Sequence, residues 1–215
     1  GAIAYTDTNA INVTGVATTS TVLIASNTAN VTDSGAITGT TLTVNSVTGS
    51  VLDFGHTVTG FNATNTTSGD ISFVNTAAPL TITSITQSGG GNVSVTNTGA
   101  LTVSGAISSG TGSVTLSSTG LALLNAGITA VNNAISVTGV GITQATGITA
   151  DAGSGAITYN AGTGALTLTG TAALLSTGII TLTQDTASIS PASQIGGTAG
   201  FLGTAATVII QPTTA

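Results

Sequence analysis

The chain contains no Lys, Arg, Cys, Met or Trp, and its only acidic residues are six Asp, so its formal net charge is −6. Without a cationic side chain nothing can neutralise a phosphate backbone, which excludes nucleic-acid binding. Without Cys, disulfide bonds and thiol chemistry are excluded as well. The single His, His56, leaves few side chains for general acid–base work. We therefore expect no enzyme activity, no catalytic residues and no cofactor.

The composition favours strands over helices. Apolar residues make up 40% of the 215 residues and the mean hydropathy is +0.55, yet runs such as 120–124 fall far short of the ~20 residues that span a membrane. We expect a chain that does not span the membrane. The β-branched residues Thr, Val and Ile, together with Gly and Asn, dominate over good helix formers, which indicates an all-β protein.

The chain repeats itself with a period of roughly 21 residues. Six stretches read small, small, apolar, Ser or Thr, apolar, and begin at Gly69, Gly91, Gly112, Asn133, Gly155 and Gly178. A second apolar segment follows about ten residues later, as at Leu80, Leu101, Leu121 and Leu166. A third, shorter one recurs at Ile107, Ile128 and Ile148. Each unit thus holds three short strands between turns.

This periodicity predicts a right-handed parallel β-solenoid with three short strands and roughly 21 residues per coil. Alternation then assigns the two sides of the first strand of each unit. The residues expected to point inward are Ile71, Phe73, Val93, Val95, Val114, Leu116, Ile135, Val137, Ile157, Tyr159, Ile180 and Leu182. The residues expected to point outward are Ser72, Ser94, Thr115, Ser136, Thr158 and Thr181. Stacked Thr and Ser can hydrogen-bond, whereas a like charge on every rung would repel its neighbours.

No linker or charge run divides the chain, so we expect residues 1–215 to form one continuous solenoid. Residues 68–184 should form regular coils. Residues 1–67 keep the composition but lose the register, which indicates less regular coils. Residues 185–215, with Pro191 interrupting a strand, should form irregular C-terminal coils that end in the strand-prone segment 208–210.

The units beginning at Gly91 and at Gly155 resemble the repeats of filamentous-haemagglutinin-type exoproteins, which are bacterial surface adhesins exported by two-partner secretion. The resemblance covers roughly residues 69–184. It implies a β-solenoid shaft located outside the cell, on the bacterial surface or in a matrix. It also implies a role in adhesion or in building filaments.

His56 and the Asp residues are the candidates for polar chemistry. His56 follows Asp53, Phe54 and Gly55, but the sequence offers no third ligand nearby, so we expect a solvated or locally bonded loop histidine. Asp33, Asp53 and Asp70 are spaced so that they could form a carboxylate row at one corner of the solenoid and bind Ca²⁺. Asp is also a common turn residue. We therefore expect these residues to lie in turns, with no metal site.

Outward hydroxyls raise a third possibility, ice binding by flat Thr rows. The candidate pairs are Thr81/Thr83, Thr102/Ser104, Thr167/Thr169 and Thr181/Thr183. Thr is also the best uncharged residue for an outward strand position, so the rows do not require this function. Polysaccharide lyases use the same fold, but they need a Lys or Arg base that the chain lacks.

The two end segments carry no charge or helix that would cap the solenoid. Gly1–Tyr5 and Val208–Ile210 are both strand-prone, which predicts end-to-end self-association or continuation of a longer solenoid. Two functions follow: a structural extracellular filament or matrix protein, which we favour, and an adhesin shaft that binds glycans or cell surfaces. Outward aromatic residues would favour the adhesin, and Tyr5 and Phe201 are the expected contributors.

Overall fold

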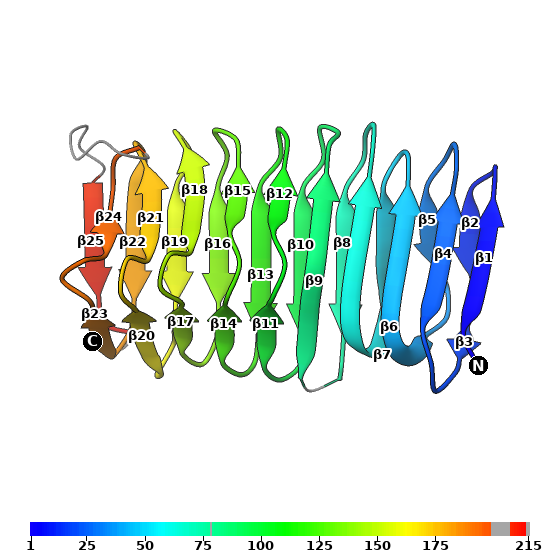
Figure 1. The fold of residues 1–215 in the computed structure, drawn as a ribbon, viewed down its shortest axis with the longest axis horizontal. Helices are drawn as coiled ribbons and strands as arrows, with labels where there is room; N and C mark the ends of the chain where they lie inside the picture. Colours follow the sequence, from blue (N-terminus) through cyan, green and yellow to red (C-terminus); the bar gives the residue numbers. More distant parts are fainter. Residues whose placement is uncertain (78, 199–206, 214–215) are drawn as a thin grey trace.

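A computed structural model describes residues 1–77, 79–198 and 207–213. It forms a parallel β-solenoid of about 9 turns with ~21 residues per coil, and no helix occurs in the described residues. The stack is elongated, with the N-terminus and the C-terminus at opposite ends of its long axis (Figure 1). The predicted fold is therefore confirmed. Each coil has three sides, called face 1, face 2 and face 3 in the order in which the chain reaches them.

Face 1 is a ladder of parallel strands joined by hydrogen bonds from one coil to the next. Its strands are β2 (Ile11–Val13), β5 (Val31–Asp33), the start of β7 (Ser50–Asn65), β8 (Ile71–Asn75), β10 (Val93–Asn97), β13 (Val114–Ser118), β16 (Ile135–Thr138), β19 (Ile157–Asn160), β22 (Ile179–Thr183) and β25 (Thr207–Gln211).

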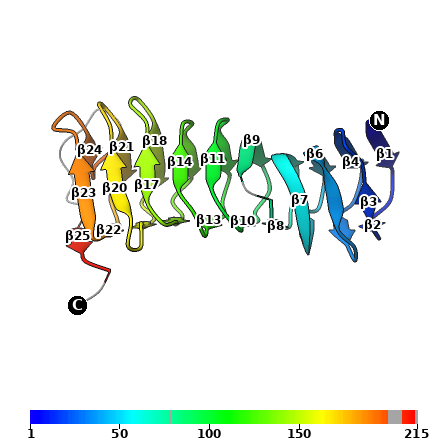
Figure 2. The ribbon, with the colours of Figure 1, turned by 90° about the horizontal axis from the view of Figure 1, so that it is seen from below.

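Face 2 is built from shorter strands and lies toward the viewer in Figure 2. Its strands are β3 (Val16–Ala17), the start of β6 (Ile37–Ser46), the middle of β7, the start of β9 (Leu80–Gln87), β11 (Leu101–Val103), β14 (Ala122–Leu124), β17 (Ile142–Gln144), β20 (Ala165–Leu168) and β23 (Thr186–Ile189).

Face 3 completes the triangle and lies in front in Figure 1. Its strands are β1 (Ile3–Asp7), β4 (Val22–Ser26), the ends of β6, β7 and β9, β12 (Ile107–Ser109), β15 (Ile128–Ala130), β18 (Thr149–Gly153), β21 (Ala173–Ser176) and β24 (Gln194–Ile195). The chain runs up face 3 in front and down face 1 behind while it advances toward the C-terminus (Figures 1 and 2), so the solenoid is right-handed.

The core consists of inward side chains stacked in rows along the axis. All twelve residues expected to point inward are buried, and Val93 pairs with Val114, which pairs with Ile135. The six residues expected to point outward all keep some exposure. Because one coil has no partner for its apolar side chains, each added coil supplies the burial, at roughly 1.5–3 kcal/mol for a fully buried aliphatic side chain.

Glycine recurs where two coils approach closely before face 1. A Cβ atom at Gly91 would collide with the backbone carbonyl of Gly69, and one at Gly112 would collide with that of Gly91. The recurrent Gly at the start of each unit therefore reflects close backbone contact between adjacent turns.

The coil formed by β7 departs from the regular pattern. Leu52 pairs with Phe73 and His56 pairs with Asn75, so a longer segment of β7 lies opposite a shorter segment of β8. β7 therefore carries a bulge. Next to it, the rings of Phe61 and Phe73 stack with centroids 3.9 Å apart. The ring of Phe73 also stacks on that of His56, at 5.3 Å. The coils before residue 68 therefore contain the largest local irregularity on face 1.

Candidate functional site: the open ends of the stack

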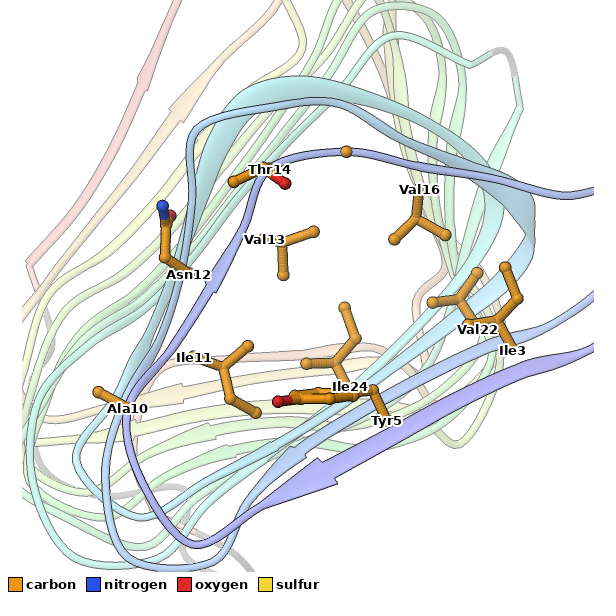
Figure 3. A pocket seen from close by; sticks show the side chains of 11 residues that line it. Ile3, Tyr5, Ala10, Ile11, Asn12, Val13, Thr14, Val16, Val22 and Ile24 are labelled. Atoms are coloured by element: carbon orange, nitrogen blue, oxygen red, sulfur yellow. The ribbon is translucent and has the colours of Figure 1, made fainter.

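The N-terminal end of the solenoid leaves its core open. Within the part of the chain that the structure describes, β1, β2 and β3 each pair with a neighbour on one side only. Ile3 and Tyr5 occupy inward rows but are 37% and 52% exposed, because no coil covers them. Behind them lies a hollow of about 360 Å³, and Figure 3 shows Ile11, Val13 and Val22 around it.

A local hydrogen-bond network holds the edge of this opening. The Tyr5 hydroxyl donates to Asp7 Oδ2 at 2.9 Å, and the backbone N–H of Asn9 donates to Asp7 Oδ1 at 3.0 Å. The hydrogen bond to Asp7 raises the pKa of Tyr5, while the Asn9 N–H lowers the pKa of Asp7. The Tyr5 ring thus lies beside the open core in an inward row, so the expectation that it faces outward was wrong.

The C-terminal end exposes the other ends of the same rows. Among the described residues, β23, β24 and β25 each pair with the preceding coil, and no strand pairs with their other edge. Val208 and Ile210 are 40% and 60% exposed although they continue the buried rows of Ile180 and Leu182. The strand expected at 208–210 is present as part of β25, whereas Phe201 lies outside the described residues.

His56 differs from the expectation of a solvated loop residue. It lies in β7 with its ring fully buried, and its Nδ1 accepts the backbone N–H of Ile37 at 2.9 Å. Its Nε2 lies 3.1 Å from Asp33 Oδ2, in a geometry too poorly aligned for a hydrogen bond. Burial lowers the pKa of His56, and the nearby Asp33 carboxylate opposes this shift. The bulge turns the side chain inward from a strand and against the preceding coil, so the expectation of a solvated or locally bonded loop histidine was wrong.

Asp33 anchors the bulge of the following coil. Its carboxylate is buried and accepts the backbone N–H groups of Asp53 and Phe54, at 3.2 and 3.0 Å. Gly55 follows with φ +86°, which glycine adopts without strain. As a result Phe54 projects outward with 59% of its surface exposed. Phe54 is an outward aromatic residue that the sequence pattern did not indicate, because the bulge that turns it outward is not visible in the repeat.

The hypothetical carboxylate row does not form. Asp33 and Asp53 lie near the end of face 1, while Asp70 precedes β8 at the beginning of face 1. There Asp70 Oδ1 accepts the backbone N–H of Asn92 at 2.7 Å. Among the described residues, no three His or Asp side chains gather closely enough to hold a metal ion. The carboxylates of Asp33 and Asp70 accept backbone N–H groups of the following coil at opposite ends of face 1. Asp33 and Asp53 lie in strands, so the expectation that they lie in turns was wrong.

The four hydroxyl pairs considered for ice binding do not share one face. Thr81, Thr102 and Thr167 belong to face 2, where Leu123 interrupts their row, while Thr181 and Thr183 belong to face 1. The hydroxyls of Thr83, Ser104 and Thr169 donate to backbone carbonyls of the preceding coil, at 3.0–3.2 Å. These side chains support turns, and they do not form a continuous Thr array.

Two buried polar rows, which the sequence pattern did not indicate, run along the corners of the core. At the end of face 1, Asn75 Nδ2 donates to Asn97 Oδ1 at 2.9 Å, and Asn97 Nδ2 donates to the carbonyl of Ala100 at 2.8 Å. At the end of face 3, Asn65 Nδ2 donates to Gln87 Oε1 at 2.9 Å. The signal was present, because inward Ile71 and Phe73 imply by alternation that Asn75 also points inward.

No family model matches the chain, and neither curated proteins nor solved structures show a match. No helix among the described residues is long and apolar enough to cross a membrane. The architecture is that of a β-helix repeat protein, and its two unpaired ends are the surfaces where the ladder and the core are interrupted together.

Proposed function

We propose that the coil stack itself is the function, as a structural element of an extracellular filament or surface matrix that grows by end-to-end β-stacking. The observation that carries this proposal is the exposure of inward residues at both ends, Tyr5 at one and Ile210 at the other. An exposed strand edge above an open apolar core favours pairing with a further coil. The resemblance to haemagglutinin-type repeats supports a location outside the cell, on a bacterial surface.

Negative-stain electron microscopy of the purified chain tests this proposal. We expect fibres whose length grows with protein concentration and whose width matches one solenoid. Discrete particles of about ten rungs, roughly 45 Å long from the ~4.8 Å strand spacing, at all concentrations would contradict it. Six Asp are the only acidic residues among 215 and there is no Lys or Arg, so few charges are available to repel a second copy.

The exposed Phe54 favours a second candidate, a shaft segment of an adhesin. Its ring is 59% exposed, and the neighbouring outward residue Val51 is 40% exposed. An exposed ring held by a rigid backbone suits contact with the apolar face of a sugar. A glycan array probed with the wild-type chain and with Phe54→Ala tests this candidate. Binding that is lost in Phe54→Ala supports the adhesin, and no binding by the wild type counts against it.

A further inference from the structure

We infer that the N-terminal opening is the docking surface for the C-terminal end of a second copy of this chain, in one defined register. This inference rests on the proposed end-to-end stacking and adds the partner, the polarity and the residue pairs. It follows from the rows that each end leaves uncovered. The inward rows of face 1 and the Tyr5 row of face 3 can be followed from coil to coil through the strand registers, so the residues that begin and end them are known.

On face 1 the inward row that begins at Ile11 ends at Val208, and the row that contains Val13 at one end has Ile210 at the other. If β25 of one copy pairs with β2 of the next copy, both rows therefore continue across the junction. Val208 and Ile210 then point into the hollow lined by Ile11 and Val13. Ile210, the most exposed of the described inward side chains at the C-terminal end, thus meets the opening at the N-terminal end.

Face 3 fits the same arrangement. Its inward row begins at Tyr5, which pairs with Ile24, and ends at Ile195, which pairs with Leu174. β24 precedes β25 within its coil, and β1 precedes β2 in the same way. When β25 pairs with β2, β24 therefore pairs with β1, and Ile195 meets Tyr5. Face 2 then keeps one open rung between β23 and β3, beside Pro212 where the chain leaves β25. Two of the three faces are paired by a single placement.

The charges near the two ends do not oppose this placement. Asp7 ends β1, at the corner between face 3 and face 1. Asp185 lies between β22 and β23, at the corner between face 1 and face 2. In the stacked pair Asp7 and Asp185 therefore do not lie side by side, where two like charges would be destabilising. A head-to-head arrangement would instead place Asp7 of both copies at the same interface, and parallel pairing would be lost.

Because the chain contains no Cys, a disulfide can report the register without background. Asn12 and Ile209 are the two ends of one outward row on face 1, and both are exposed. In the docked pair they lie on adjacent parallel strands, within the Cα separation that a disulfide allows. Within one copy they lie at opposite ends of the stack. The double variant Asn12→Cys/Ile209→Cys should therefore form a ladder of covalent multimers on a non-reducing gel after mild oxidation.

The matched control is Asn12→Cys/Gln211→Cys, in which the second thiol lies two residues further along β25, about 7 Å away. We expect its ladder to be lost, while far-UV circular dichroism shows both variants folded. Equal ladders in the two variants, or dimers from Asn12→Cys alone at the same yield, would overturn the register. Fibres without a ladder in the first variant would also overturn it and leave end-to-end stacking intact. Discrete particles without fibres would instead contradict the proposed function.

A second measurement does not depend on oxidation. Ile210→Asp places a carboxylate in the apolar opening of the next copy, whereas Gln211→Asp places one outside on the same strand. We expect Ile210→Asp to abolish fibres at concentrations where Gln211→Asp still forms them. Fibres of equal length in both variants would contradict the docking of β25 against this opening.

Discussion

The coil that contains β7 and the regular coils from β10 to β22 must all fill the core and satisfy their backbone N–H groups, and they do so in different ways. In the regular coils each inward aliphatic residue covers the next, as Val93 covers Val114. In the β7 coil a bulge breaks the row. Asp33 of the preceding coil accepts the N–H groups of Asp53 and Phe54 in the bulge, and His56, which the bulge turns inward, accepts the N–H of Ile37 in the preceding coil. The difference teaches that an insertion is tolerated when polar side chains satisfy the backbone groups that it frees.

The largest expected effect concerns the aromatic stack beside the bulge. Phe73→Ala should lower the free energy of unfolding by about 3–5 kcal/mol, because it leaves a cavity against the ring of Phe61. Val95→Ala, the next residue of the same row in a regular coil, should cost about 2 kcal/mol for its two lost carbons. Urea denaturation followed by circular dichroism compares them. Equal losses would mean that the irregular coil depends no more on its core than the regular ones.

The next effect tests the anchoring of the bulge. Asp33→Ala removes the acceptor of the Asp53 and Phe54 N–H groups, and we expect a loss of about 2–3 kcal/mol in the same assay. Asp53→Ala is the control, because Asp53 is exposed and its loss should change stability by less than about 0.5 kcal/mol. If the control costs as much as Asp33→Ala, the buried carboxylate is not the anchor.

A smaller effect is expected from the buried amide row of the regular coils. Asn97→Ala removes the acceptor of Asn75 Nδ2 and the donor to the Ala100 carbonyl, which should cost about 1–3 kcal/mol. Asn97→Ser should recover part of this loss, since Ser118 occupies the next position of the row and donates to the carbonyl of Gly120. No difference between the two variants would show that solvent replaces the amide.

The smallest effect is a pH dependence confined to the β7 coil. Burial lowers the pKa of His56 in the folded state, so the unfolded chain binds more protons near its ordinary value of about 6.5. The stability from neutral His56 is full above that value and falls as the pH decreases toward the lowered pKa. His56→Asn, which copies Asn75 in the same row, should flatten the slope of unfolding midpoints between pH 7.5 and 5.5. An unchanged slope would show that His56 does not carry the pH dependence.

The regular coils could be predicted from the sequence because their inward rows use one residue class at a fixed period. The bulge could not be predicted, since Asp53, Phe54 and Gly55 form a turn-like segment whose extra residues become visible only against the register of β8. For the same reason His56 was expected in a loop. The two open ends were predicted from uncharged, strand-prone segments, but the hollow beside Ile11 and its match to Val208 required the coordinates.

By itself, the sequence determined the all-β class, the coil of roughly 21 residues and the side on which the aliphatic and hydroxyl residues of each regular first strand lie. The physical reason is that a fixed repeat of aliphatic and hydroxyl side chains has one low-energy stacking. Only the tertiary structure decided which polar groups lie inside, because burial of Asn75, Asp33 and His56 depends on backbone N–H and C=O groups contributed by neighbouring coils.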